Sequence, residues 1–277
     1  MKILTVAGTT FVFLTVALTQ SMSTRAQTHT SPEIVLPKTP SAVRDAEAIA
    51  TVNKAISALG GAGAISRISD LTLTGTMDGP ENSTLKNGTF LWKISGGEVR
   101  TEANGSQGAS VVVSGHGRPA YTRDGQAYRL PAYMSRSRVS FQCPGALLLE
   151  HLQNDLATIE MIHDPDSAHT PGVRLRTSLI SDPKGLGRPP LQWTFDPATG
   201  LPVHLEYWIV VSAIPYQRAK VAIDMASYRN YSGVLLPSVF ATYTNGGLEG
   251  TFHVASAVAN QRLANEEFDL LPREVLK

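Results

Sequence analysis

The sequence predicts a mostly β protein with flanking helices: a strongly curved antiparallel sheet, or incomplete β-barrel, plugged by two or more α-helices. Short stretches of alternating apolar and polar residues recur along the chain, and Asp, Pro, Gly or Asn clusters separate most of them. One amphipathic helix is expected before these strands and another between their two halves. A sheet that is apolar on one face must cover that face, and two such helices suffice for a curved sheet.

The N-terminal residues predict an export signal. Lys2 precedes an apolar stretch from Ile3 to Leu18, and Thr24-Arg25-Ala26 offers the small residues that a signal peptidase reads. Residues 1–26 are therefore expected to be a cleavable signal peptide. Three prolines without periodicity follow, so residues 27–41 are expected to be a flexible mature N-terminus. Residues 42–277 are expected to form a single domain, since no interior stretch has a linker's composition.

The first predicted elements are a helix and a set of antiparallel strands. The helix runs from Ala42 to Leu59, with apolar residues at three-and-four spacing, and Gly60-Gly61 should end it. A short further turn is expected around Ile65 and Ile68. The first strands are then expected around Leu71–Thr76, Phe90–Ile94, Val99–Glu102 and Val111–Val113, followed by a hairpin over Tyr121–Leu130.

A second helix and a second set of strands follow. Pro144 suits a first helical position, and leucines continue one apolar face to Leu156. The later strands are expected around Val173–Leu179, Leu191–Phe195, Val203–Ile209, Val221–Met225, Val239–Tyr243 and Phe252–Val254. Burying each Val or Leu on the inner face contributes about 1.5–3 kcal/mol, which outweighs weak local propensities.

Composition excludes several function classes. The formal net charge is +1, from 24 basic and 23 acidic residues, so no electrostatic footprint for nucleic acid exists. The single cysteine, Cys143, cannot form an internal disulfide. A chain that is 42% hydrophobic and 17% charged has the composition of a protein with a substantial core.

Few side chains suggest chemistry. His163 and His169 flank an acidic loop that could hold a divalent metal, but Pro165 and Pro171 favour a solvated loop. Cys143 lies at a helix start, where a thiol pKa can fall, yet His151 is its nearest candidate base and can lie on another face. No catalytic residue, metal or cofactor is therefore assigned.

Two turn motifs and the segments around them resemble a known family. The motifs are Asp196-Pro197-Ala198-Thr199-Gly200-Leu201-Pro202 and Tyr228-Arg229-Asn230-Tyr231-Ser232-Gly233-Val234-Leu235-Leu236-Pro237. With Ala58-Leu59-Gly60-Gly61 near the start, Ala259-Asn260, and Phe268 near the end, they resemble bacterial exported proteins of the lipoprotein-carrier (LolA/LolB-like) fold. That resemblance implies an incomplete barrel over an apolar cavity that takes acyl chains. In carriers an arginine reaches into the cavity, and Arg100 is the nearest candidate here.

The sequence thus favours a periplasmic or secreted, non-catalytic protein of the bacterial envelope that holds a lipid, an acyl chain or another hydrophobic ligand. Candidate ligand-binding residues are Leu71, Leu73, Phe90, Trp92, Arg100, Leu148, Leu149, Leu152, Trp193, Phe195 and Tyr207. Expected partners are a hydrophobic small molecule or a lipidated protein, with peripheral contact to an envelope membrane. The alternatives are a secreted hydrolase at the barrel mouth, using Cys143 or the His163/His169 loop, and a partner-binding envelope protein whose sheet edge pairs with another chain.

Overall fold

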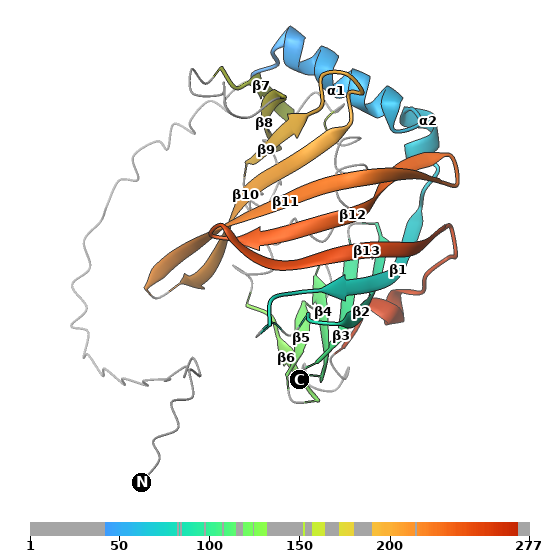
Figure 1. The fold of residues 1–277 in the computed structure, drawn as a ribbon, viewed down its shortest axis with the longest axis vertical. Helices are drawn as coiled ribbons and strands as arrows, with labels where there is room; N and C mark the ends of the chain where they lie inside the picture. The colour runs from blue at the N-terminus through green and yellow to red at the C-terminus, as the bar shows by residue number, and fades with distance from the viewer. Residues whose placement is uncertain are drawn as a thin grey trace, which may run out of the picture. The chain divides into compact units, whose positions relative to one another are not determined.

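The alternating segments form thirteen strands of one antiparallel sheet in the described part of the chain (Figure 1). The computed structural model describes residues 42–81, 83, 85–96, 98–106, 108–114, 119–123, 125–131, 152, 157–163, 172–179, 190–213 and 215–270. The expected signal peptide, the N-terminal tail and the helix Pro144–Leu156, apart from Leu152, lie outside these residues. All described residues belong to one compact unit, Ser41–Lys277.

The strands have the following bounds: β1 (Asp70–Asp78), β2 (Gly88–Ser95), β3 (Glu98–Gly105), β4 (Gly108–Ser114), β5 (Ala120–Arg123), β6 (Gln126–Arg129), β7 (Ala157–Met161), β8 (Val173–Leu179), β9 (Leu191–Phe195), β10 (Pro202–Ala213), β11 (Tyr216–Tyr231), β12 (Val234–Thr244) and β13 (Gly247–Ala259). Every predicted strand is present. β7 was not predicted, because Ala157, Glu160 and Met161 are weak β formers in a run of only five residues.

The sheet consists of two meanders joined by one ladder. Its order is β6-β5-β4-β3-β2-β1-β13-β12-β11-β10-β9-β8-β7, so β1–β6 and β7–β13 each pair consecutively, and β1 pairs with β13. The order ends at β6 on one side and β7 on the other, and the described strands do not close into a barrel. This open, curved antiparallel sheet confirms the predicted fold class.

Cross-strand register assigns the two faces of the sheet. On β2, Trp92 pairs with Leu73 on one side and with Thr101 on the other, so these three side chains share the inner face. In the second meander, Trp193 pairs with Leu205 and Leu175 on that same face. Inner-face side chains from both meanders join one hydrophobic core cluster.

Helix α1 (Ala46–Ala58) adds its apolar face to that core. Ala48, Val52, Ala55 and Ile56 are buried, and Asp45 caps the helix by accepting a hydrogen bond from the Glu47 amide. The predicted start at Ala42 was four residues too early. Residues before Asp45 instead pair with β7, where the Ile159 amide donates to the Val43 carbonyl at 2.8 Å. In the described ranges, no helix is long and apolar enough to cross a membrane.

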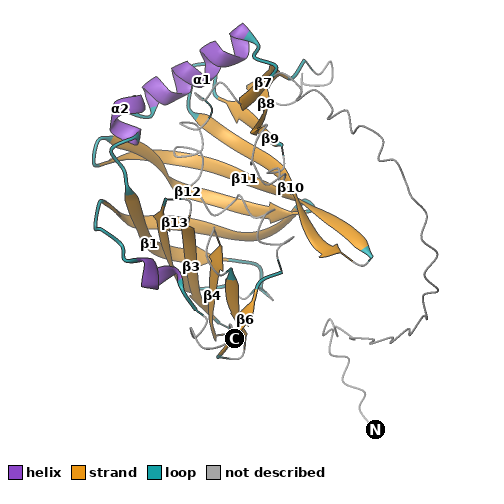
Figure 2. Cartoon of the chain, turned by 180° about the vertical axis from the view of Figure 1, so that it is seen from behind, coloured by secondary structure: helices purple, strands orange, loops and turns teal. Residues whose placement is uncertain are grey.

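The predicted stop at Gly60-Gly61 is confirmed. The Gly61 amide donates to the Ile56 carbonyl at 2.8 Å and the Gly60 amide to Ser57 at 3.2 Å, which is the Schellman arrangement. Gly60 has φ 119°, and a Cβ there would lie 2.3 Å from the Gly233 carbonyl oxygen. The second helix, α2 (Ala62–Ile65), follows directly. Both helices lie along one end of the sheet, beside β7–β9 and the β11–β12 hairpin (Figures 1 and 2).

A short 3-10 helix, η3 (Asn265–Phe268), packs on the opposite, outer face of β3. The Arg100 guanidinium donates to the Glu267 carbonyl at 2.9 Å, and the Glu267 carboxylate pairs with Lys93. The hydrogen bond with Lys93 lowers the pKa of Glu267 more than burial raises it. Phe268 is buried, so η3 is fixed by an apolar anchor as well as by charge.

Candidate ligand-binding site

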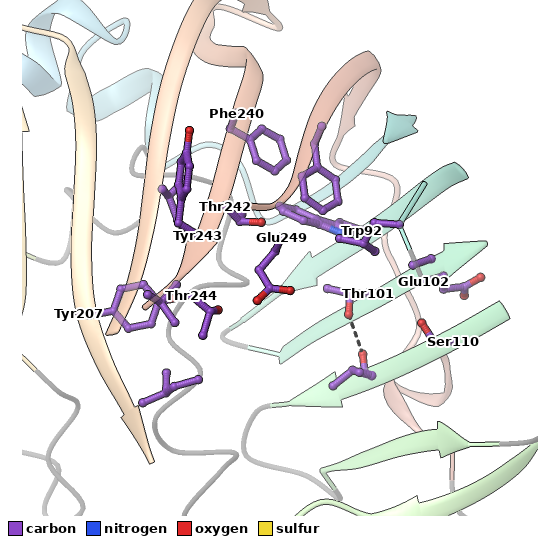
Figure 3. A pocket seen from close by; sticks show the side chains of 17 residues that line it. Trp92, Thr101, Glu102, Ser110, Tyr207, Phe240, Thr242, Tyr243, Thr244 and Glu249 are labelled. Atoms are coloured by element: carbon purple, nitrogen blue, oxygen red, sulfur yellow. Dashed lines mark hydrogen bonds between the residues drawn. The ribbon is translucent and has the colours of Figure 1, made fainter. Parts of the chain in front are cut away.

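A pocket of about 360 Å³ lies on the inner face, with β2–β4 on one side and β10–β13 on the other (Figure 3). Most of its walls are aromatic or aliphatic, with a minority of hydroxyl and carboxylate groups. The lining residues are Leu85, Trp92, Thr101, Glu102, Ala103, Ser110, Val112, Tyr207, Ile209, Val221, Ile223, Phe240, Thr242, Tyr243, Thr244, Glu249 and Phe252.

Short side chains leave this part of the inner face hollow. Thr101, Ala103 and Val112 project from β3 and β4 where a packed core would carry larger groups. On β9, by contrast, Trp193 and Phe195 are fully buried and stack with ring centroids 6.1 Å apart. The inner face is therefore filled at the helical end and open at the other.

An aromatic cluster forms one wall of the pocket. The rings of Phe240 and Phe252 stack with centroids 4.9 Å apart, and Trp92 lies 5.0 Å from Phe240. Phe90 supports them from within the core, 5.4 Å from Phe252. Because Phe90 and Trp92 belong to the first meander and Phe240 and Phe252 to the second, the cluster fixes the two halves of the sheet against each other. Each such ring pair contributes about 0.5–1.5 kcal/mol beyond burial.

Polar groups occupy a limited part of the lining. The Thr101 hydroxyl donates to the Val112 carbonyl at 3.5 Å, and the Thr242 hydroxyl donates to the Gly250 carbonyl at 3.4 Å. The Glu249 side chain extends into the space between Thr101 and Thr244 in the view of Figure 3. These groups make part of the mainly apolar lining polar.

Two tyrosines line the pocket in different ways. Tyr207 is buried, with 2% of its surface exposed, and its ring belongs to the core. Tyr243 hydrogen-bonds Asp224 through its hydroxyl, and burial, followed by the nearby Asp224 charge, raises its pKa. Its hydroxyl is therefore engaged by β11 and remains protonated at neutral pH.

A charged network lies on the outer face of β10 and β11. The His204 ring contacts Asp224 at 2.5 Å through Nδ1 and Glu206 at 3.3 Å through Nε2, and Lys220 contacts Glu206 at 2.7 Å. Burial raises the pKa of Glu206, but hydrogen bonds from Lys220 and His204 outweigh it, so the pKa is lowered overall. His204 and Glu206 are both partly exposed on this face.

The predicted site residues other than Arg100 fall into three groups. Trp92 and Tyr207 line the pocket. Six others belong to the core and are at most 4% exposed: Leu71, Leu73, Phe90, Leu152, Trp193 and Phe195. Leu148 and Leu149 lie outside the described residues.

Arg100 lies on the outer face, bonded to Glu102 at 2.6 Å and to η3, and does not line the pocket. The reason is register: its neighbour Thr101 is the residue that pairs with Trp92 on the inner face. The equivalence with the cavity arginine of carriers is therefore not supported by its position.

The residues proposed for chemistry are only partly described. His163 is exposed, whereas His169 and Cys143 lie outside the described residues. Within the described ranges, no group of three or more His, Cys, Asp or Glu side chains is arranged to hold a metal ion. The lining residues Thr101, Ala103, Thr242 and Glu249 were not predicted, because nothing in their local sequence distinguishes them from ordinary strand residues.

No protein-family model and no curated protein matches this sequence. Solved structures are similar in fold. A LolA superfamily protein from Nitrosomonas europaea aligns with a TM-score of 0.49 at 9% identity, over 80% of this chain and 97% of that one. A DUF1329 family protein from Desulfovibrio piger aligns with a TM-score of 0.47 at 9% identity, over 83% and 99%. The first belongs to the family that the sequence motifs resemble. At this identity the likeness concerns the fold alone.

Proposed function

We propose that this protein is an exported, non-catalytic binding protein that holds an apolar ligand, such as an acyl chain, in the pocket between the two meanders. The observation that carries the proposal is the pocket itself. Its volume of about 360 Å³ and its mainly apolar lining fit a small-molecule site, for which roughly 300–1,000 Å³ is usual. The leader expected over residues 1–26 supports a periplasmic or secreted location.

The pocket's size sets the scale of binding. At roughly 30 Å³ for a water-sized group, it accommodates on the order of a dozen methylene-sized groups. Transferring about twelve methylenes from water contributes at most ~10 kcal/mol, at ~0.8 kcal/mol each. Association costs of at least ~4 kcal/mol leave at most about 6 kcal/mol, which corresponds to a Kd of tens of micromolar or weaker. This affinity suits a protein that takes up and releases its ligand.

Filling the pocket tests the proposal. Ala103 lines the pocket on β3, so Ala103→Trp should occupy the space and weaken the binding of an apolar fluorescent probe at least tenfold. Ala109→Trp is the matched control. Ala109 is exposed on the neighbouring strand β4 and pairs with Asn104, the residue after Ala103 on β3. Successive strand residues face opposite sides of the sheet, so Ala109 lies on the side away from the Ala103 side chain. The control should bind the probe as the native protein does.

Mass spectrometry of the native protein identifies what occupies the pocket. A free lipid and a lipidated protein present the same acyl chain, and the mass of the co-purified species distinguishes them. Equal probe binding by the native protein and Ala103→Trp would refute the pocket as the site. The hydrolase and partner-binding alternatives gain no support from the described residues.

A further inference from the structure

The charged side chains in the described lining of the pocket are all acidic. Among the described lining residues, the charged ones are Glu102 and Glu249, and no Lys, Arg or His is present. Glu102 directs its carboxylate to Arg100, whose Nε lies 2.6 Å away. Glu249 has no cationic partner among the described residues. The charged side chain that the described lining leaves for a ligand is therefore an acidic one.

The hydroxyl groups beside Glu249 reinforce this polarity. Thr101 and Thr242 use their hydroxyl hydrogens toward the backbone carbonyls of Val112 and Gly250. Figure 3 shows the bond from Thr101 as a dashed line. A hydroxyl that donates elsewhere offers its oxygen lone pairs, so these two groups act as acceptors toward the pocket. Together with the carboxylate, they favour a ligand group that donates hydrogen bonds.

The aromatic wall suits the same partner. Trp92 lines the pocket with its ring 5.0 Å from Phe240 and 5.6 Å from Phe252, so three aromatic residues of the lining are grouped together. The face of an aromatic ring is negative and attracts a cation placed within about 6 Å of its centre. A carboxylate on the ligand would meet the Glu249 charge and the aromatic rings without a counter-ion from the described lining, which offers it only neutral donors such as the Ser110 hydroxyl.

We infer that the preferred ligand is an amphiphile whose apolar chain ends in a protonated amine, with Glu249, Thr101 and Thr242 accepting its hydrogen bonds. This inference rests on the proposed function, because it assigns the ligand class of the same pocket. Neutral donors such as alcohols rank second. Fatty acids and other anionic amphiphiles rank last.

Three ligands with the same chain test this order: dodecylamine, dodecanol and dodecanoate, each measured below its micellar concentration by displacement of a bound apolar probe. At neutral pH the amine is cationic, as a lysine side chain is. Dodecylamine should bind about tenfold more tightly than dodecanol, since an exposed ion pair and a cation–π contact each contribute modestly. Dodecanoate should bind more weakly than dodecanol.

Glu249→Gln isolates the carboxylate. It should weaken dodecylamine binding about tenfold, strengthen dodecanoate binding, and change dodecanol binding less than about twofold. Glu160→Gln, which makes the same charge change on β7 outside the pocket, should preserve the native order. Glu249 is exposed, so folding should be unaffected, and thermal unfolding of both variants checks this.

The possible failures are distinguishable. Equal binding of all three ligands, or tighter binding of dodecanoate, overturns the ligand class while the pocket remains a binding site. A native order that persists in Glu249→Gln also overturns it. If none of the three ligands displaces the probe or binds, the proposed function itself fails, and this inference fails with it.

Discussion

Gly75 is the position on β1 where an added methyl group should do most damage. The residue lies next to the register shift between β1 and β13, and a Cβ there would be 2.0 Å from the His253 carbonyl oxygen and 2.8 Å from Phe90 Cε1. Since heavy atoms pack at about 3.5–4.0 Å, β1 would have to move about 1.5 Å away from β13. This movement breaks the ladder that joins the two meanders.

The expected cost of Gly75→Ala is about 3–5 kcal/mol of unfolding free energy. Overpacking contributes about 1–3 kcal/mol, and two strained ladder hydrogen bonds contribute about 1 kcal/mol each. Urea unfolding followed by tryptophan fluorescence measures the change. Gly63→Ala is the matched control, because a Cβ at Gly63 meets nothing within 4 Å and Gly63 lies in α2. Its stability should stay the same or rise by up to about 1 kcal/mol.

A second variant separates the two contacts. Phe90→Leu in the Gly75→Ala background removes the clash of the new methyl group with the Phe90 ring. The closer clash, with the His253 carbonyl oxygen, remains. The double variant should therefore remain destabilised. An unfolding midpoint of Gly75→Ala equal to that of the native protein would refute the reasoning, and rescue by Phe90→Leu would place the clash at the ring instead.

Two further predictions concern buried and paired carboxylates. Asp70 is 4% exposed and accepts hydrogen bonds from the Gln261 amide at 2.7 Å and the Arg262 amide at 3.0 Å, so Asp70→Ala should cost about 2–3 kcal/mol in urea unfolding; an unchanged midpoint would contradict this. The hydrogen bond with Lys93 lowers the pKa of Glu267 in the folded protein below its usual value of 4.5. The ionised carboxylate therefore stabilises the fold fully above pH 4.5, and this stabilisation is lost as the pH falls through the lower pKa of the folded state. The stability difference between the native protein and Glu267→Gln should shrink as pH falls below 4.5, and a constant difference would disprove the linkage.

The sequence predicts the faces of the strands better than the space between them. Alternation placed Trp92 and Tyr207 on the inner face, and both line the pocket. It placed Trp193 there equally well, yet Trp193 is fully buried in the packed core and does not line the pocket. Which part of an inner face is filled depends on how distant strands curve together, and local periodicity carries no information on that.

Arg100 and β7 show two other limits. Arg100 was chosen by analogy, although it alternates with Val99 and Thr101, whose partners Ile94 and Trp92 lie on the inner face. The β7 strand has helix-favouring residues, and its conformation depends on pairing with β8 and with the chain before α1. In contrast, the Gly60-Gly61 stop was predicted because a local backbone geometry specifies it.

The strand order has a consequence for how the binding site comes into being. The N-terminal and C-terminal meanders share the single β1–β13 ladder and the ring cluster across it, while both outer edges of the sheet come from the middle of the sequence. A backbone break between Leu130 and Ala157 would therefore leave every described strand pair intact. Two separately produced fragments that end and begin there should reassemble on mixing. The rate at which binding of the apolar probe returns would then measure how fast one half docks onto the other.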